Sequence, residues 1–310
     1  MKEDNFHTPV LVEEVLKYLL VNPSGIYIDG TLGGGGHSSE ILKRLTSNAK
    51  LIGIDLDQEA VEKAGNRLSA FQKQIILKKG NFVEIANILD SLGFDQVDGI
   101  LLDLGVSYHQ IDSAERGFSY IKSGPLDMRM SKDAEMSAIT IINNYSEKEL
   151  EKIFKEFGEE RRAHFIAKAI VKDRTKNPIS TTDQIVKIIE SEISFQYRIK
   201  SLARIFQAIR IAVNKELENL RSFLDQSLQL LKSGGRLVII AYHSLEDRMV
   251  KEFFAEQSNP CHCPPEFPMC VCGKEPTIRL LTRKVIRPKE DEIKLNPRSR
   301  SARLRAVEKI

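Results

Sequence analysis

The chain has 310 residues, 42% of them hydrophobic, and a formal net charge of only +3. This length provides ample material for a core and predicts either one large domain with a substantial insertion or two domains. No apolar run approaches the roughly 18 residues that a membrane span needs, and acids occur among the first residues, so we expect a soluble, cytoplasmic enzyme with no membrane partner.

The first hundred residues alternate predicted helices and strands. Pro9 to Leu20 has the periodicity of an amphipathic helix. Four strand-like runs follow at 26–29, 51–55, 75–79 and 97–104, and helical segments at 38–45, 58–68 and 84–92 lie between them. This alternation predicts a doubly wound α/β fold, in which helices cover both faces of a parallel sheet.

A glycine-rich loop follows the first predicted strand. The strand ends at Asp29, and four consecutive glycines at 33–36 precede the helical segment. Glycine tolerates positive φ and lets a ligand approach the backbone, so this arrangement is typical of a nucleotide-type cofactor pocket. The next strand ends at Asp55, where a carboxylate can accept hydrogen bonds from ribose hydroxyls. Together these features predict a cofactor that contains adenosine.

The loop favours S-adenosylmethionine over a dinucleotide. A G-x-G-x-x-G pattern that begins at Gly33 would need its last glycine at Ser38. A pyrophosphate also prefers the N-terminus of a helix. S-adenosylmethionine has no phosphate but has a sulfonium and an ammonium group, which suit the acid Asp29 ahead of the loop. A dehydrogenase and a plain glycine-rich surface loop are the alternatives.

Two further candidates follow the third and fourth strands. Ligands of open parallel sheets bind beyond the carboxyl ends of the strands. Phe82 lies there, and its ring can either cover an adenine or belong to the core. Asp103 ends the buried run 100–102, where it either caps local backbone or faces the pocket. We favour the pocket, because a buried acid requires partners.

The alternation stops after Gly105. Helical segments are predicted at 146–157, 161–173, 181–193 and 202–231, and two of them begin with capping-box spacing, at Ser146 and Thr181. We therefore expect a helical insertion at 107–202 within a cofactor domain made of residues 1–106 and 203–310.

The sheet resumes with a predicted strand at 235–242, and later strands are predicted at 281–286 and 302–307. His243 and Ser244 follow the first of these strands directly. They either contribute to the pocket or cap a helix at 245–255.

The four cysteines form two C-x-C pairs. They are Cys261, Cys263, Cys270 and Cys272. In a cytosolic chain this pattern suggests a metal site more than disulfides, and four thiolates suit a tetrahedral structural zinc. A reduced loop stiffened by its prolines is the alternative, because C-x-C is less usual than C-x-x-C.

Nine sequence motifs carry a family resemblance. They are HTPV (7–10), DGT with GGH (29–31 and 35–37), ILLDLGVS (100–107), ERGFS (115–119), GPLDMRM (124–130), GEER (158–161), FQAIRI (206–211), HSLEDR (243–248) and NPRSRSA (296–302). These motifs span nearly the whole chain, and together they resemble the RsmH (MraW) family of bacterial ribosomal RNA small-subunit methyltransferases.

The resemblance implies a Rossmann-like class I methyltransferase fold. It also implies methyl transfer from S-adenosylmethionine to the N4 amine of a cytidine in the decoding centre of 16S ribosomal RNA, with that RNA or the small ribosomal subunit as partner. The cofactor contacts that it implies are Gly35, Gly36, His37, Asp55, Phe82, Asp103 and Gln110. Read without the resemblance, His37 would be a surface or helix-capping residue, and Gln110 would not be selected. A methyltransferase for another RNA base or ribose, and a non-catalytic RNA-binding assembly protein, are the alternatives.

Transfer to a cytosine amine requires acceptors aimed at the amino hydrogens, because the N4 lone pair is delocalised into the ring. Many amino methyltransferases provide these acceptors with an Asp-Pro-Pro-Tyr type motif after the fourth strand. Here Asp103 is retained as the predicted catalytic residue, but no proline follows and the first aromatic is Tyr108. His243 and Ser244 are the other candidates for the amine acceptor.

Two basic segments favour a polyanionic partner, which the resemblance implies is RNA. Residues 279–310 contain eleven Lys and Arg against four acids, and residues 198–221 contain six against two. The target base must be unpaired or flipped out, and the insertion is expected to serve as an RNA-recognition domain. The predicted phosphate contacts are Arg298, Arg300, Arg303 and Arg305. On one unbroken strand, the first two would face away from the last two.

Overall fold

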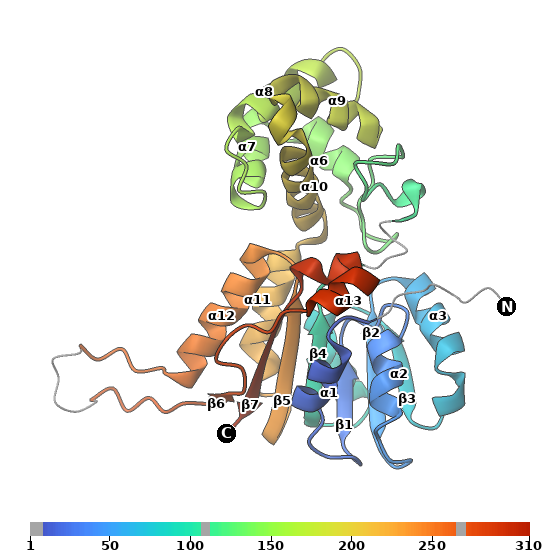
Figure 1. Cartoon of the computed structure of the whole chain (residues 1–310), viewed down its shortest axis with the longest axis vertical. Helices are drawn as coiled ribbons and strands as arrows, with labels where there is room; N and C mark the ends of the chain where they lie inside the picture. Colours follow the sequence, from blue (N-terminus) through green and yellow to red (C-terminus); the bar gives the residue numbers. More distant parts are fainter. Residues whose placement is uncertain (1–8, 107–111, 265–270) are drawn as a thin grey trace. The chain divides into compact units, whose positions relative to one another are not determined.

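The sheet has seven strands among the described residues. The computed structural model describes residues 9–106, 112–264 and 271–310. The strand order is β3-β2-β1-β4-β5-β7-β6 (Figure 1). The strands are β1 Ile26–Asp29, β2 Lys50–Asp55, β3 Ile75–Lys79, β4 Val97–Asp103, β5 Leu231–Ala241, β6 Ile278–Leu280 and β7 Arg303–Lys309. The first five pair in parallel, whereas β7 is antiparallel to both β5 and β6.

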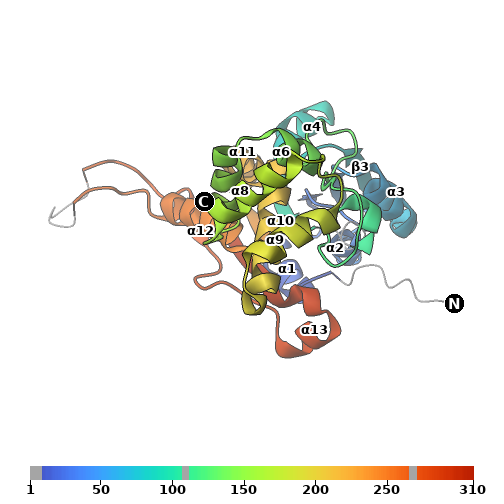
Figure 2. The ribbon, with the colours of Figure 1, turned by 90° about the horizontal axis from the view of Figure 1, so that it is seen from above.

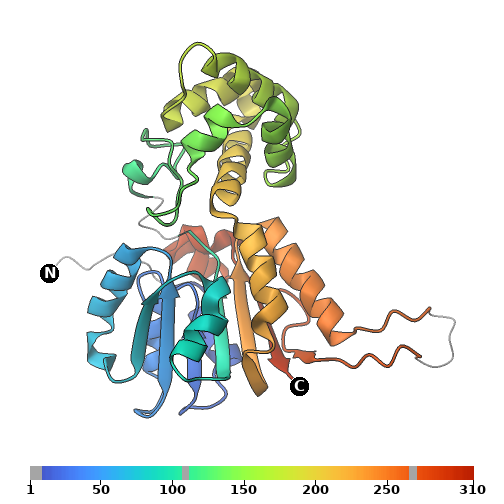
Figure 3. The same cartoon turned by 180° about the vertical axis from the view of Figure 1, so that it is seen from behind.

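Helices cover both faces of this sheet. One face carries α1 Val12–Leu19, α2 Gly36–Leu42 and α3 Gln58–Arg67 (Figure 1). The other carries α4 Ile85–Ser91, α11 Glu216–Ser227 and α12 Ser244–Ser258 (Figure 3). Successive strand residues enter opposite cores, as Tyr27 and Ile28 of β1 do, because strand side chains alternate between faces. This order and layering confirm the predicted doubly wound, Rossmann-like class I methyltransferase fold.

The chain divides into two compact units. The first comprises residues 1–105 and 218–310 and contains the sheet. The second comprises residues 106–217 and contains α6 Ala138–Asn144, α7 Glu147–Glu156, α8 Ala163–Arg174, α9 Thr182–Glu192 and α10 Arg198–Asn214. The expected boundary between residues 202 and 203 falls inside α10, and the whole of α10 belongs to the second unit.

The second unit is built around its own apolar core. Helix α10 contacts α6, α7 and α9 (Figure 2), and buried side chains of all five helices form one cluster. The predicted capping boxes are present, with Ser146 before α7 and Thr181 before α9. Helix α6 was not predicted, because its seven residues are too few for a clear periodicity.

The prediction of one helix over 202–231 is wrong. The chain turns at Lys215, which adopts a left-handed φ of 50° between α10 and α11. The preceding Asn214 uses its side chain to bind Met128 O and Met130 N, at 2.9 and 2.7 Å. These long-range contacts fix the end of α10, and no turn residue in the sequence marks it.

Strand β6 is also displaced from its predicted position, whereas β7 at 303–309 agrees with the strand predicted at 302–307. Strand β6 occupies 278–280 instead of 281–286, and Ile286 forms only an isolated bridge with Leu304. Helix α13, Glu290–Leu295, follows it. A short 3-10 helix at Pro297–Ser301 precedes β7, so Arg298 and Arg300 do not lie on the same strand as Arg303 and Arg305. No helix in the described part of the chain combines the length and apolar character needed to cross a membrane.

Candidate active site

The register of the sheet brings four strand ends to one edge of the first unit. Asp29 at the end of β1 is paired with Gly53 of β2 and Leu101 of β4, and Asp103 of β4 is paired with Ile240 of β5. The residues that follow β1, β2, β4 and β5 therefore lie near one another. This is the edge at which open parallel sheets bind their ligands.

Asp29, the last residue of β1, holds the two ends of the glycine-rich loop. Its side chain is buried and accepts hydrogen bonds from the Ser38 hydroxyl at 2.7 Å and from the Thr31 N–H at 3.3 Å. Burial raises the pKa of Asp29 above its ordinary value, against the effect of the Ser38 hydrogen bond. One carboxylate oxygen thus holds the backbone at the start of the loop, and the other holds the Ser38 side chain of α2.

Gly35 is the point at which the loop turns into α2. It adopts φ of +73°, a left-handed conformation that only glycine adopts without strain. A Cβ at this position would lie 3.2 Å from Ala64 Cβ and 3.3 Å from Leu68 Cδ1. The sequence therefore requires glycine here both for its dihedral angle and for its small size.

Asp55 joins the loop to the end of β2. One carboxylate oxygen accepts the Gly33 N–H at 2.7 Å, and the other accepts the Asp57 N–H at 2.8 Å. Burial raises the pKa of Asp55 to about 6, although these hydrogen bonds act to lower it. A carboxylate has about four acceptor positions, so two remain for ribose hydroxyls.

His37 and Asp103 form the centre of the strand-end edge. His37 Nε2 lies 3.4 Å from Asp103 Oδ2, and the histidine is only 7% exposed. Neither ring nitrogen of His37 makes a hydrogen bond within the described residues. The backbone N–H of Asp103 donates to Thr31 Oγ1 at 2.6 Å, which attaches the end of β4 to the loop. A buried imidazole without a hydrogen bond is suited to a polar ligand.

Tyr242 is a site residue that the sequence interpretation missed. It follows β5, and burial together with the negative charge of Asp103 raises the pKa of its hydroxyl well above the ordinary value. A Cβ on Gly105 would lie only 2.8 Å from Tyr242 Cε2, so glycine admits the ring beside the Asp103 loop. An aromatic residue at the end of a predicted strand was the available signal, but its partner depends on the β4–β5 pairing.

His243 is a helix cap in this structure. Its Nδ1 accepts the Glu246 N–H at 3.3 Å, and Glu246 Oε2 accepts the N–H of His243 at 3.3 Å and of Tyr242 at 2.9 Å. These bonds form a capping box at the start of α12. The geometry thus supplies the capping alternative for His243, whereas the Asp103 carboxylate lies beside His37.

Phe82 is partly buried between the site edge and the core. It begins a 3-10 turn after β3, and its ring packs edge-to-face on Phe223, with the centroids 5.8 Å apart. The ring therefore contributes to the core. Gln110, the remaining predicted cofactor contact, lies outside the described residues.

Two of the family motifs form a clamp within the second unit. Buried Arg116 donates to the carbonyls of Arg129 and Met130 at 2.9 and 2.8 Å. Asp127 accepts two hydrogen bonds from the Arg129 guanidinium, at 2.8 and 2.9 Å. Although burial acts to raise it, the pKa of Asp127 is held below its ordinary value by Arg129. These contacts shape a loop of the second unit.

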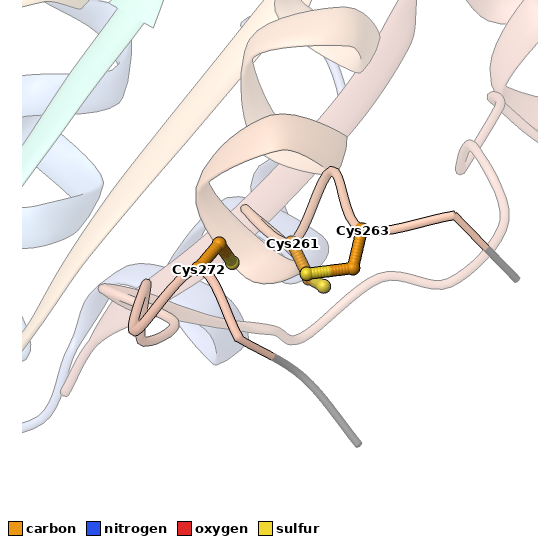
Figure 4. Close-up of side chains that lie close together, drawn as sticks. All are labelled: Cys261, Cys263 and Cys272. Carbon is orange, nitrogen blue, oxygen red and sulfur yellow. The ribbon is translucent and has the colours of Figure 1, made fainter. Parts of the chain in front are cut away.

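Three of the four cysteines come together in the first unit (Figure 4). The sulfur atoms of Cys261, Cys263 and Cys272 lie within 4.8 Å of one another. Cys270 lies outside the described residues.

The predicted phosphate contacts differ in their surroundings. Arg305 Nε lies 2.7 Å from Asp247 Oδ1, and Arg303 lies 3.6 Å from the other oxygen of the same carboxylate. Both guanidinium groups are therefore engaged within the first unit. Arg298 and Arg300 belong to the 3-10 helix ahead of them.

Comparison with known proteins agrees with this geometry. A family model described as the MraW methylase family matches residues 4–310. A protein of Clostridium botulinum strain 657, named ribosomal RNA small subunit methyltransferase H, is 51% identical over 306 residues, covering 98% of this chain and 99% of its own length. A protein of the same name from Symbiobacterium thermophilum is 48% identical over 307 residues, with 98% and 96% coverage.

A more distant likeness exists among solved structures. The crystal structure of a putative rRNA methylase from Clostridium thermocellum aligns over 96% of this chain and 95% of its own, at 11% identity and a TM-score of 0.42. No conclusion about this chain depends on so distant a likeness. The family model and the two close relatives cover almost every residue, and the chain belongs to the MraW methylase family.

Proposed function

We propose that this chain transfers the methyl group of S-adenosylmethionine to the N4 amine of a decoding-centre cytidine in 16S ribosomal RNA. The observation that carries the proposal is the convergence of Asp55, the glycine-rich loop and Asp103 at one edge of the sheet. The relatives at about 50% identity, which are named as small-subunit ribosomal RNA methyltransferases, support the class of substrate.

The residues at this edge fit the methyl donor. Asp55 retains acceptor positions for the ribose hydroxyls, and glycine at 35 and 36 lets the loop backbone pack closely on Ala64, Leu68 and Pro9. The imidazole of His37 is buried and lacks a hydrogen bond within the described residues, so it can meet the polar amino-acid portion of the donor. When bound, the donor supplies an electrophilic methyl group on a sulfonium.

Asp103 is proposed to accept a hydrogen bond from the amino group of the cytosine. Positive charge develops on N4 as the new bond forms, and a nearby carboxylate stabilises that charge more than the neutral ground state. The Tyr242 hydroxyl, which its raised pKa keeps protonated, donates to Asp103 and orients it. Tyr242 is therefore a positioning residue in this proposal. It follows β5, whereas the aromatic residue of an Asp-Pro-Pro-Tyr type motif follows the fourth strand.

The second unit is proposed to bind RNA through an aromatic and basic surface at the start of α10. Phe195 is 84% exposed and Tyr197 is 56% exposed, and the Arg198 guanidinium lies 5.7 Å from the centre of the Phe195 ring. Exposed rings can stack on unpaired bases, and nearby cations attract phosphates. With Arg303 and Arg305 engaged by Asp247, this surface is the better candidate for the first RNA contacts.

Nucleoside analysis tests the proposed reaction. 16S RNA and small subunits from a strain that lacks the endogenous activity would be incubated with the chain and isotopically labelled donor, then digested and examined by mass spectrometry. We expect the label in N4-methylcytidine, a loss of at least about a hundredfold in the Asp103→Asn variant, and no change in Asp90→Asn, an exposed acid on α4. Label in ribose or another base would overturn the proposal, as would RNA binding without any transfer.

A further inference from the structure

The cysteine cluster lies in an arm that has no core of its own. The arm, residues 259–277, leaves the end of α12 and returns to β6 (Figure 1). Its two ends are tied together, because Thr277 donates its N–H to Gln257 O at 3.0 Å and its hydroxyl to Gln257 Oε1 at 2.8 Å. Between them, no described residue of the arm is buried, and none belongs to a helix or strand.

An exposed arm of this kind has no apolar burial to offset the conformational entropy of its backbone. Small segments without a core are commonly ordered by a disulfide or a metal ion. The arm nevertheless brings three thiols from both of its limbs into one place, with Cys261 and Cys263 on the outgoing limb and Cys272 on the returning limb (Figure 4).

The distances fit a metal-thiolate centre. A zinc ion with Zn–S bonds of about 2.3 Å holds its tetrahedral sulfurs about 3.8 Å apart. The three sulfurs here all lie within 4.8 Å of one another, so a small movement of the side chains brings them to that spacing. In addition, the Val271 N–H donates to Cys263 Sγ at 3.4 Å. A backbone N–H directed at sulfur favours the thiolate, which is the form that binds metal.

We propose that the arm binds one structural zinc ion through the thiolates of Cys261, Cys263 and Cys272. The ion links the two limbs, and the free energy of metal binding stabilises the ordered conformation of the arm. Thiolate ligands favour zinc over magnesium or calcium, which prefer oxygen. The arm lies on the β6 side of the first unit, and the strand-end residues that hold the methyl donor do not belong to it.

Metal analysis of the full chain tests this site. Protein purified under reducing conditions is expected to contain one zinc ion per chain, and replacement by Co²⁺ is expected to give a sulfur-to-cobalt charge-transfer band. Cys261→Ser and Cys272→Ser should each lose the metal, whereas Glu275→Gln, which removes an exposed potential ligand from the same arm, should keep it.

A second readout does not depend on activity. Removal of zinc by a chelator is expected to increase the rate of proteolysis within residues 259–277 at least tenfold, while the affinity of the rest of the chain for S-adenosylhomocysteine changes by less than about twofold. Restoring zinc should restore the protection. A chain that holds no zinc when reduced, or that is protected equally with and without it, would overturn the proposal, and an intramolecular disulfide found under non-reducing conditions would replace it.

Discussion

The Gly33 N–H donates to Asp55 Oδ2 at 2.7 Å, so the carboxylate proposed to hold the ribose also holds the glycine-rich loop. The buried carboxyl of Asp55 has a pKa of about 6. We therefore expect the affinity of the chain for the cofactor to depend on pH. Above this pH Asp55 is ionised and accepts hydrogen bonds, and below it the group is protonated and loses acceptor strength. The ammonium group of a free amino acid titrates above this window, so the α-amino group of the cofactor stays charged across it.

We therefore expect S-adenosylhomocysteine to bind about tenfold more weakly at pH 5 than at pH 7.5, since about one-tenth of Asp55 is ionised one unit below its pKa. Asp55→Asn should weaken binding about 10- to 100-fold at pH 7.5 and flatten the profile. Isothermal titration calorimetry measures both effects, with Asp90→Asn as a control that keeps the slope. An unchanged slope in Asp55→Asn would assign the titration to another group.

Gly35 and Gly93 provide a matched pair of substitutions. Both have φ of +73°, but a Cβ at Gly35 would press on Ala64 and Leu68, whereas a Cβ at Gly93 meets nothing within 4 Å. Alanine at either position should lower the free energy of unfolding by about 1–2 kcal/mol through the left-handed backbone. Only Gly35→Ala should also weaken cofactor binding, at least about tenfold, because its loop must shift. Thermal unfolding and titration calorimetry of the two variants separate these effects, and equal affinities would contradict the role of the loop.

Tyr242→Phe tests the positioning of Asp103. The variant keeps the ring but removes the donor to the carboxylate, so we expect the single-turnover rate of methyl transfer to fall about 10- to 100-fold. Loss of a donor to the charged form raises the pKa of Asp103, so the acidic limb of the pH–rate profile should move to higher pH. Tyr27→Phe is the control, because the Tyr27 hydroxyl hydrogen-bonds to the backbone of Val21 and Asn22 instead of Asp103. A slower rate with an unmoved profile would reduce Tyr242 to a structural residue.

The aromatic surface of the second unit predicts a separable RNA effect. Replacing Phe195 and Tyr197 by alanine removes exposed rings, and each lost base stack costs about 1–3 kcal/mol of binding free energy. Fluorescence anisotropy should show at least tenfold weaker binding of a single-stranded 16S fragment, with cofactor affinity intact. Ile121→Ala, which removes another exposed apolar side chain of this unit, should leave RNA affinity unchanged. If the aromatic double variant bound RNA as tightly as the unchanged chain, this surface would not be the RNA contact.

Local patterns predicted the parts of the site that local geometry determines. The run from Asp29 through the glycines specifies a strand, a turn and a helix within about ten residues, and Asp55 follows the next strand by the same logic. Tyr242 could not be identified in this way, because its position beside Asp103 follows from the pairing of β4 with β5, which lie more than a hundred residues apart in the chain.

The same distinction between local and long-range contacts explains why some boundaries of helices and strands were predicted correctly and others were not. Ser146 and Thr181 cap their helices with side chains three residues away, and the sequence reveals both. The break at Lys215 depends on Asn214 binding the backbone near Met128, and the position of β6 depends on its pairing with β7. Neither partner is close in sequence, so neither boundary has a local signal.

Residues 106–217 enter the chain between β4 and β5, which are adjacent and parallel in the sheet, and α11 still runs between these strands on the way back. The crossover that a parallel pair requires is therefore complete without the added unit. In evolutionary terms the second unit is modular: an ancestral catalytic sheet could acquire, enlarge or exchange it without altering the order of a single strand.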